Sequence, residues 1–414
     1  MIDQYFPCAR VCERIQRNAS RNVLVELVAH LAERGYRRAT IRGYVWAVEH
    51  FTAWLESQNR SLETVDKNLV RSFLGEHLPD CHCPSPSPVG VYQVRPALNH
   101  LLRLLRGRTG GGRSDSPIDT EVQQYRDHLR RICGLSEATC LYRMRYAREF
   151  LQGRFGQEAL DWDALQPKDI VAFAVGYAER CRRRSAQMAA ESLRSFLRYL
   201  QFHGRCNAAL LAAVPRIAHW RLSHLPPSMT KEQSRAFLGT FDRSTPTGRR
   251  DYAMALCQIV LGFRVSEVAG LLLDNINWHS AVVRIEAPKG GRSRELPLVK
   301  RVGQAIADYL RRGRPSSPCR NVFIRHRAPR GPVSTAVIHG AIHGALVKVK
   351  GCEHWAGTHV LRHTAATDML REGASLKEIA DVLGHRSIET TTIYAKVDLP
   401  GLNIVTMPWP EVEP

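Results

Sequence analysis

The stretch LGHRSIETTTIYAKV, residues 383–397, decides the interpretation of this chain because it places Tyr394 nine residues after His385. Three further polar side chains lie upstream, in the stretches GFRVSE and THVLRH: Arg264, His359 and Arg362. A phosphodiester is anionic and has a poor leaving group, so attack on it without a metal needs a nucleophile, a cationic clamp and a proton donor. Arginine suits the clamp because it is permanently charged and offers planar, paired donors. The set therefore predicts phosphoryl transfer through a covalent bond to Tyr394.

Taken one at a time, these side chains also have ordinary structural explanations. Arg264 precedes Glu267 by three residues, a spacing typical of an ion pair on a helix surface. His359 and Arg362 are also three residues apart and would share a helix face. A tyrosine near a carboxyl terminus usually packs in a core. The order and combination of the whole set are far more specific than any one member.

Four segments resemble, in order, the signature boxes of the tyrosine recombinase (phage integrase) family. They are GFRVSEVAGL at 262–271, PKGGRSRELPL at 288–298, THVLRHTAATDML at 358–370 and LGHRSIETTTIYAKV at 383–397. The resemblance, to Xer-like site-specific recombinases, is strong over about residues 229–396 and weaker over 117–215. It implies a mainly α fold with a small antiparallel sheet, in which helical SAM-like core-binding domains precede a catalytic domain.

The resemblance also implies a role for each matching residue. Tyr394 would attack the scissile phosphate and become joined to the DNA 3′ phosphate, leaving a free 5′ hydroxyl. Lys289, the only lysine of the 288–298 box, would be the general acid for the departing oxygen. Glu267 would orient the first arginine. The other matching residues would hold the phosphate or assist proton transfer: Arg264, His359, Arg362 and His385. We expect His363, in an apolar setting, to be structural.

The function implied is site-specific DNA recombination of the integrase or transposase type in a mobile element. Double-stranded DNA would be the partner of a homotetramer working on two DNA sites, with accessory recombinases or DNA-bending proteins as further partners. No cofactor or metal is expected, because one phosphodiester replaces another and neither a GxxxxGK[ST] loop nor an acidic two-metal cluster stands out. Two alternatives stay open: a type IB topoisomerase-like enzyme or hairpin-forming resolvase, and a non-catalytic DNA-binding protein.

The composition is that of a large, basic globular protein. The chain has 414 residues, is 44% hydrophobic and carries 59 Lys and Arg against 39 Asp and Glu, a formal net charge of +20. This surplus favours a polyanionic partner, although a GC-rich genome would also raise the arginine content. The amino terminus lacks a signal-peptide core and no run of about 18 apolar residues occurs. We therefore expect a cytoplasmic, nucleoid-associated prokaryotic protein without membrane contact.

Two breaks organise the chain, a Gly/Ser-rich stretch and a stretch around consecutive prolines. The expected order is an N-terminal helical DNA-binding-like domain at 1–106, a linker at 107–116, a core-binding helical domain at 117–215, a linker at 216–228, a catalytic domain at 229–396 and a tail at 397–414. The proline-rich tail is not a regular helix. It would pack on its own domain or be exchanged between protomers.

The first two domains resemble duplicates of one another. Residues 39–51 align without gaps with residues 138–150 at an offset of 99, and residues 98–105 match residues 193–200. Chance similarity between basic amphipathic helices is the alternative. Both domains carry arginines that we expect to contact DNA phosphates: Arg42, Arg143, Arg145, Arg182, Arg183 and Arg184.

The sequence predicts that the catalytic part is mostly helical with one β-hairpin. Residues 282–287 alternate apolar and polar side chains, and residues 294–298 return after a glycine turn. Thr230 followed by Gln233 has the capping-box pattern of a helix start. Helices are predicted over 359–371, 376–383 and 387–395.

The eleven cysteines are scattered and odd in number, which indicates a reducing compartment rather than a disulfide framework. One cluster stands out: Cys81-His82-Cys83 follows His77, with Cys8 and Cys12 far upstream. Zinc sites usually contain CxxC pairs, which are absent here. We interpret the segment as an irregular loop leading into the proline-rich run 84–88, and whether Cys81 and Cys83 bind metal stays open.

Overall fold

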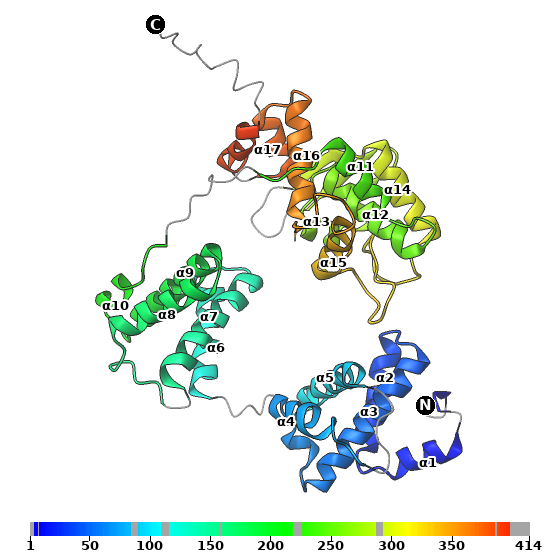
Figure 1. Ribbon diagram of the computed structural model, residues 1–414, viewed down its shortest axis with the longest axis vertical. Helices are drawn as coiled ribbons and strands as arrows, with labels where there is room; N and C mark the ends of the chain where they lie inside the picture. The colour runs from blue at the N-terminus through cyan, green and yellow to red at the C-terminus, as the bar shows by residue number, and fades with distance from the viewer. Residues whose placement is uncertain are drawn as a thin grey trace, which may run out of the picture. The chain divides into compact units, whose positions relative to one another are not determined.

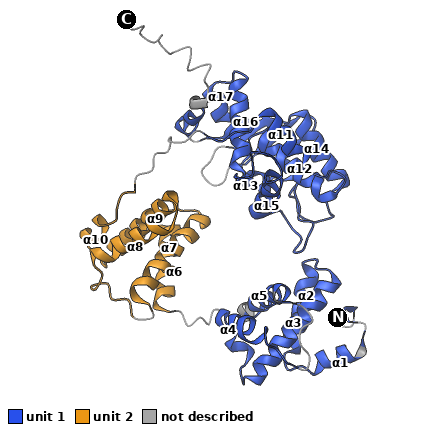
Figure 2. Ribbon diagram, in the orientation of Figure 1, with its two compact units in different colours: residues 1–110, 224–414 blue, residues 111–223 orange. Residues whose placement is uncertain are grey.

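The computed structural model describes residues 4–6, 8–83, 90–108, 116–156, 159–217, 226–286, 293–355, 357–385 and 387–397. The fold is mainly α-helical with one small antiparallel sheet, as predicted (Figure 1). Contacts divide the chain into two compact units, residues 1–110 with 224–414 and residues 111–223 (Figure 2). None of the helices in the described parts of the chain is long and apolar enough to span a bilayer.

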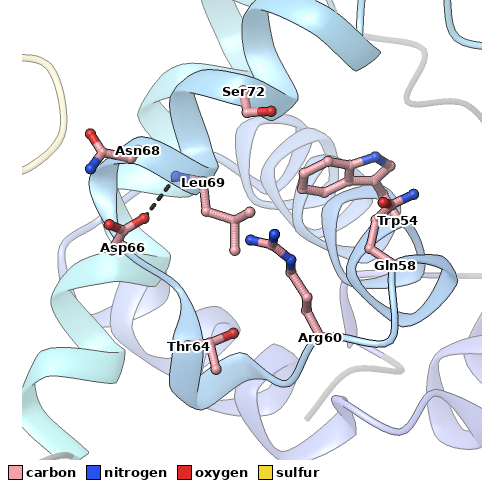
Figure 3. A pocket seen from close by; sticks show the side chains of 8 residues that line it. All are labelled: Trp54, Gln58, Arg60, Thr64, Asp66, Asn68, Leu69 and Ser72. Atoms are coloured by element: carbon pink, nitrogen blue, oxygen red, sulfur yellow. Dashed lines mark hydrogen bonds between the residues drawn. The ribbon is translucent and has the colours of Figure 1, made fainter.

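The N-terminal part of the first unit is a helical bundle with its own hydrophobic core. Its elements are α1 (Ala9–Arg17), α2 (Arg21–Glu33), α3 (Arg38–Ser57), η2 (Leu62–Thr64), α4 (Lys67–Ser72), η3 (Phe73–His77) and α5 (Val91–Arg108). Leu27 of α2, Phe51 of α3 and Leu101 of α5 are completely buried in this core. Helix α4 begins where Asp66 accepts a hydrogen bond from the backbone N–H of Leu69, beside a hollow of about 460 Å³ (Figure 3).

The second unit is a compact helical bundle. Its elements are α6 (Pro117–Arg131), α7 (Glu137–Phe155), α8 (Pro167–Arg180), α9 (Arg183–Phe202) and α10 (Ala208–Ala212). Tyr125, Phe150 and Phe196 pack in its core, because these helices place apolar residues three and four positions apart. Helices α6 and α7 begin at the side-chain caps Ser116 and Ser136.

The two helical parts repeat one order of packed helices. In the N-terminal part α2 packs on α3 and α3 on α5, and in the second unit α6 packs on α7 and α7 on α9. The segments that match in sequence occupy corresponding helices, with residues 39–51 in α3 and 138–150 in α7. The second matching pair likewise lies in α5 and α9. The duplication itself stays a prediction from the sequence.

The C-terminal part of the first unit has a separate hydrophobic core surrounded by helices. Its elements are α11 (Lys231–Gly239), α12 (Pro246–Ile259), α13 (Val265–Gly270), η4 (Leu273–Asn275), β1 (Ile276–Asn277), β2 (Val282–Ile285), β3 (Arg294–Pro297), α14 (Lys300–Arg312), α15 (Thr335–Leu346), α16 (His359–Arg371), α17 (Leu376–Leu383), η5 (Ile388–Thr390) and η6 (Thr392–Val397). The predicted capping box is present, with Thr230 and Gln233 exchanging hydrogen bonds at the start of α11.

The predicted hairpin forms strands β2 and β3 of a three-stranded antiparallel sheet in the order β1-β2-β3. Val283 pairs with both Ile276 and Leu296, and all three side chains are buried in the core. Strand β1 was not predicted because two residues are too short to show an alternating pattern. The turn at 287–292, which contains Lys289, lies outside the described residues.

The prediction of an α-helix over 387–395 is wrong, because two 3₁₀ segments, η5 and η6, occupy this region. The backbone N–H of Thr391 bonds to the carbonyl of Ile388, and that of Tyr394 to the carbonyl of Thr391, three residues back in each case. Consecutive β-branched threonines disfavour a regular α-helix here. Residues 398–414, which hold all but the first residue of the predicted tail, lie outside the described residues.

Candidate active site

Arg264 stands at the N-terminal cap of α13 and is fixed by Glu267. The Glu267 carboxylate accepts the backbone N–H of Arg264 at 2.8 Å and its Nη1 at 2.9 Å. The backbone bond closes the first turn of a short helix, while the side-chain bond aims the guanidinium. In this structure Glu267 holds both the backbone and the guanidinium of Arg264, while its supporting role in catalysis stays a prediction.

Glu267 also holds a second guanidinium, that of Arg294 at the start of β3. Arg294 donates to both carboxylate oxygens, at 3.0 and 2.8 Å. The side chain of Glu267 is only 6% exposed. Burial alone would raise the pKa of this carboxyl, but the hydrogen bonds from Arg294 and Arg264 lower it below its usual value. Glu267 is therefore an ionised anchor shared by two arginines.

The C-terminal end of helix α17 gathers three arginines on consecutive carbonyls. Arg294 Nε donates to the carbonyl of Val382 at 2.9 Å, Arg362 Nη2 to that of Leu383 at 2.6 Å, and Arg264 Nη2 to that of Gly384 at 2.9 Å. The last carbonyls of a helix have no partner within the helix and carry the negative end of its dipole. The helix end thus orients guanidinium groups that would otherwise repel one another.

Arg362, on the first turn of α16, is the most deeply placed of the three. It is 6% exposed, and its Nη1 also donates to the carbonyl of Gly262. Gly262 has φ +66°, and a Cβ there would lie 2.5 Å from the Leu383 side chain, so only glycine fits this turn. Burial, and then the charge of Arg264, lowers the pKa of Arg362 to about 10, which leaves it protonated near pH 7.

His385 directly follows the helix end that binds the arginines. Its Nδ1 lies 2.7 Å from the hydroxyl oxygen of the buried Thr391, which fixes the ring. Burial, and then the positive charges of Arg362 and Arg264, lowers the pKa of His385 to about 4. A neutral imidazole beside cations is suited to hydrogen bonding with a phosphate oxygen or to accepting a proton.

Tyr394 is buried and hydrogen-bonded in this structure. It is 2% exposed and packs with Ala366, Ile379 and Leu383, while its hydroxyl lies 2.9 Å from Nδ1 of His363. Burial raises the pKa of Tyr394, so the phenol is protonated near pH 7. Burial, and then His359 and Arg362, lowers the pKa of His363 to about 4, so this histidine is neutral. Contact with the hydroxyl of Tyr394, the predicted nucleophile, gives His363 a more direct place in the site than we expected from sequence.

The structure shows less about two other predicted catalytic residues, His359 and Lys289. His359 begins α16 with an exposed side chain, and its ring centre lies 6.3 Å from that of His363. Lys289 lies outside the described residues. The structure therefore brings together five elements of the predicted set: Arg264, Glu267, Arg362, His385 and the Tyr394 region.

The arginines predicted to contact DNA differ in their surroundings. Arg182, Arg183 and Arg184 are exposed at the start of α9. Arg145 is exposed and paired with Glu149, whereas Arg143 is half-buried and donates to the hydroxyl of Ser195 at 2.9 Å. Arg42 is half-buried in α3. Arg145 and the three arginines at the start of α9 are therefore the exposed members of this set.

Known proteins resemble this chain over most of its length. A profile of the Phage integrase family matches residues 227–399, and a profile of the Phage integrase N-terminal SAM-like domain matches residues 24–79. A Sinorhizobium fredii protein named "Putative integrase/recombinase y4rA" is 36% identical over 394 residues, covering 94% of each chain. The chain belongs to the phage integrase family of tyrosine recombinases. This tyrosine recombinase is 30% identical to Tyrosine recombinase XerC of Pelobacter propionicus, over 69% of its own chain and 93% of the relative.

Solved structures show the same fold. The Tn1549 transposon integrase, in complex with transposon right end DNA, has a TM-score of 0.52 and 20% identity, covering 68% of this recombinase and 99% of that chain. A lambda integrase dimer bound to a COC′ core site also has a TM-score of 0.52, with 17% identity, covering 66% and 96% of the two chains. As a member of this family, the recombinase is a DNA breaking and rejoining enzyme of the site-specific type.

Two residues stand closer to this site than the sequence indicated. Arg294 was not named as a site residue, and His363 was expected to be structural. The sequence feature that could have indicated Arg294 is its place in the 288–298 box, the same box that contains Lys289. The signal for His363 was its position next to Arg362 on a helix that also carries His359, although three polar residues in five do not reveal which one reaches the tyrosine.

Proposed function

We propose that Tyr394 is the nucleophile that cleaves one DNA strand, and that Arg264 and Arg362 bind the non-bridging oxygens of the scissile phosphate. The observation that carries this proposal is the convergence of Arg264, Arg294 and Arg362 on the end of α17, directly before His385 and the tyrosine segment. Fixed donors beside a site where negative charge develops are a large source of catalysis in phosphoryl transfer.

In the first step, the Tyr394 oxygen forms a bond to phosphorus and the bond to the 5′ oxygen breaks. The phenol proton passes to a neutral histidine, and His363 already lies 2.9 Å from this oxygen. Lys289 gives its proton to the departing 5′ oxygen. In the second step, a 5′ hydroxyl of another strand attacks the 3′-phosphotyrosine and regenerates the phenol. Bond energy is conserved, so the reaction needs no high-energy cofactor.

The buried position of Tyr394 adds a requirement to this proposal. A side chain that is 2% exposed cannot reach a phosphate on a separate DNA molecule. Residues 392–397 form 3₁₀ turns, whose hydrogen bonds are weaker than those of an α-helix. We infer that the η6 segment shifts when DNA binds, which moves the hydroxyl from His363 toward the arginine cluster.

The proposed substrate is double-stranded DNA at specific sites of a mobile element. The net charge of +20 and the exposed arginines at the start of α9 favour phosphate contacts. The helical parts 1–106 and 117–215 would then be related DNA-binding domains, which together give a longer footprint than one such domain. A homotetramer on two DNA sites in the bacterial cytoplasm, with accessory recombinases or DNA-bending proteins, would complete the exchange.

A covalent trap tests the nucleophile. Wild-type protein and the Tyr394→Phe variant are incubated with fragmented genomic DNA, the reaction is stopped with detergent, and protein-bound fragments are sequenced. We expect adducts at a few sites with wild-type protein and none with Tyr394→Phe. The half-buried Tyr252, in α12, supplies a control, and Tyr252→Phe should form adducts as the wild type does.

The outcomes separate the alternatives. Adducts formed by Tyr394→Phe would disprove the assignment of the nucleophile. Wild-type adducts spread evenly over the DNA would favour the topoisomerase-like alternative.

A DNA substrate with sulfur in place of the departing 5′ oxygen tests Lys289. We expect Lys289→Ala to cleave this substrate normally and the ordinary substrate poorly, because a thiolate leaves without a proton donor.

A further inference from the structure

Four potential metal ligands meet in the N-terminal part of the chain, far in sequence from the tyrosine. His50 lies on α3, His77 ends the π-helical turn η3, and Cys81 and Cys83 follow it. Their ligand atoms all lie within 4.8 Å of one another. His82, between the two cysteines, is exposed and does not belong to the group.

The distances within this cluster are those of ligands around one small ion. His50 Nε2 and His77 Nε2 lie 3.3 Å apart, Cys81 Sγ lies 3.2 Å from His50 Nε2, and Cys83 Sγ lies 3.5 Å from His77 Nε2. Zinc binds sulfur at about 2.3 Å and imidazole nitrogen at about 2.0–2.1 Å in a tetrahedron. Such a tetrahedron separates two nitrogens by about 3.3 Å and a nitrogen from a sulfur by about 3.6 Å.

We propose that His50, His77, Cys81 and Cys83 bind one zinc ion that has a structural role in the N-terminal part of the chain. Two cysteines and two histidines are a frequent ligand set of closed zinc sites. Thiolate sulfur disfavours magnesium and calcium, which prefer oxygen ligands. Two thiolates would neutralise the charge of the ion, so no net charge is placed inside the protein. Both cysteine thiols lose a proton when the ion binds.

The surroundings of the cluster support the ligands. The Phe73 ring stacks on His77 at 5.2 Å between ring centres and meets His50 edge-on at 5.3 Å. Trp54, which also lines the hollow of Figure 3, packs against His77 at 5.6 Å. The backbone N–H of Cys83 points at Cys81 Sγ at 3.4 Å, a contact that stabilises a thiolate. These contacts fix the ring and sulfur positions before any ion arrives.

The path of the chain also fits a metal site. The backbone N–H of Leu78 bonds to the carbonyl of Phe73, five residues back, and this wide turn places His77 opposite His50. Turns of this π type are frequent at functional sites. A cavity of about 560 Å³ is lined by His50 and Cys83 and gives an ion access from solvent. The ion would tie the segment after η3 to the middle of α3.

The sequence alone did not favour this site because it offers Cys-x-Cys rather than a CxxC pair. His50 lies 27 residues before His77, inside a helix whose pattern is otherwise that of a core. Only folding brings it to the cysteines. Cys8 and Cys12, which the sequence also offered, are not members: Cys8 is exposed and Cys12 Sγ lies 3.2 Å from the carbonyl of Phe6.

Metal analysis of the full-length protein tests the proposal. The protein is purified under reducing conditions with a tag that contains no histidine, and its metals are measured by mass spectrometry. We expect about one zinc per chain in the wild type and less than about 0.2 in Cys81→Ser/Cys83→Ser. Cys133→Ser/Cys181→Ser, which changes two exposed cysteines of the second unit, is the matched control and should keep its zinc.

Cobalt titration keeps the test valid if the double variant folds poorly. Chelator-treated wild-type protein should give the visible bands of tetrahedral Co²⁺ and a thiolate-to-cobalt charge-transfer band. His50→Asn should lose the tetrahedral spectrum while the control variant keeps it. A wild-type chain that neither retains zinc nor gives this spectrum would overturn the proposal. So would copper or iron as the stoichiometric metal, or a cobalt spectrum unchanged in Cys81→Ser/Cys83→Ser.

Discussion

Folding brings polar side chains together at two places, the centre around Tyr394 and the cluster of His50, His77, Cys81 and Cys83, and the two differ in charge. The first gathers three guanidinium groups around one carboxylate and the end of a helix. The second gathers thiols and imidazoles within 4.8 Å, without a cation among them. The first is thus prepared for an anionic phosphate and the second for a metal ion. We expect the first to determine chemistry and the second to determine the stability of its own helices.

Removing Arg362 should cause the largest effect. The variant Arg362→Ala loses a buried charge and leaves the carbonyls of Gly262 and Leu383 without their donor. We expect the single-turnover rate of adduct formation at saturating DNA to fall by about 10²–10³-fold or more. Arg362→Lys keeps the positive charge but loses the planar guanidinium that donates to two carbonyls. Its rate of adduct formation should lie between those of the wild type and Arg362→Ala. A normal rate for Arg362→Ala would break the assignment of chemistry to this centre.

Removing the shared carboxylate should mainly affect stability. Glu267→Gln leaves Arg294 and Arg264 without their buried partner, and losing one member of a buried ion pair costs about 3–5 kcal/mol. Hydrogen exchange of peptides covering α13 and β3, together with calorimetry of the full chain, measures this loss. The exposed pair of Asp274 and Arg320 is the control, and Asp274→Asn should cost less than about 1 kcal/mol. Equal losses in both variants would contradict the anchoring role of Glu267.

Much of the Tyr394 centre could be predicted because its residues lie in short segments with a fixed order. Arg264, Arg362, His385 and Glu267 were named from these segments, and the structure places them around one helix end. The sequence does not show which atoms each of these side chains bonds to. Three arginines bind consecutive carbonyls of α17, and backbone carbonyls leave no trace in a side-chain pattern. For this reason the sequence did not place Arg294 or His363 beside the other residues of this centre.

The metal cluster shows the same limit more strongly. His77, Cys81 and Cys83 are close in sequence and drew attention, but three ligands in a proline-flanked segment are ambiguous. The fourth, His50, depends on how α3 packs against η3. The packing face of α3 is otherwise mostly apolar, and a buried histidine on it resembles an ordinary core residue. Tertiary packing, rather than local pattern, decides this site.

A moderate effect should follow from the basic start of α9. The triple variant Arg182→Ala/Arg183→Ala/Arg184→Ala should weaken DNA binding and reduce the slope of log affinity against log salt by up to about 3, because each lost phosphate contact changes the slope by about 0.9. Fluorescence anisotropy at several salt concentrations measures both. Arg320→Ala, which removes an exposed arginine already paired with Asp274, is the matched control and should change neither. An unchanged slope in the triple variant would mean that this end of α9 does not touch phosphates.

The smallest effect concerns the histidine that holds Tyr394. The folded-state pKa of His363 is about 4, against an ordinary value near 6.5, because burial and then His359 and Arg362 disfavour its charged form. Between these two values the unfolded chain binds more protons than the folded chain. This contribution to stability is therefore complete above about pH 6.5 and is lost as the pH falls toward 4, by at most about 1.4 kcal/mol per pH unit.

The variant His363→Gln removes this titration and keeps a polar group near the tyrosine hydroxyl. Its thermal midpoint should fall less than that of the wild type between pH 6.5 and 4.5, as measured by calorimetry in matched buffers. The same variant should also form adducts with a changed dependence on pH, if His363 receives the phenol proton. The stability of the variant could become less dependent on pH while its adduct formation keeps the wild-type pH dependence. That result would show that His363 only holds Tyr394 in its buried position. The phenol proton would then pass to His359 or His385 once the η6 segment has moved.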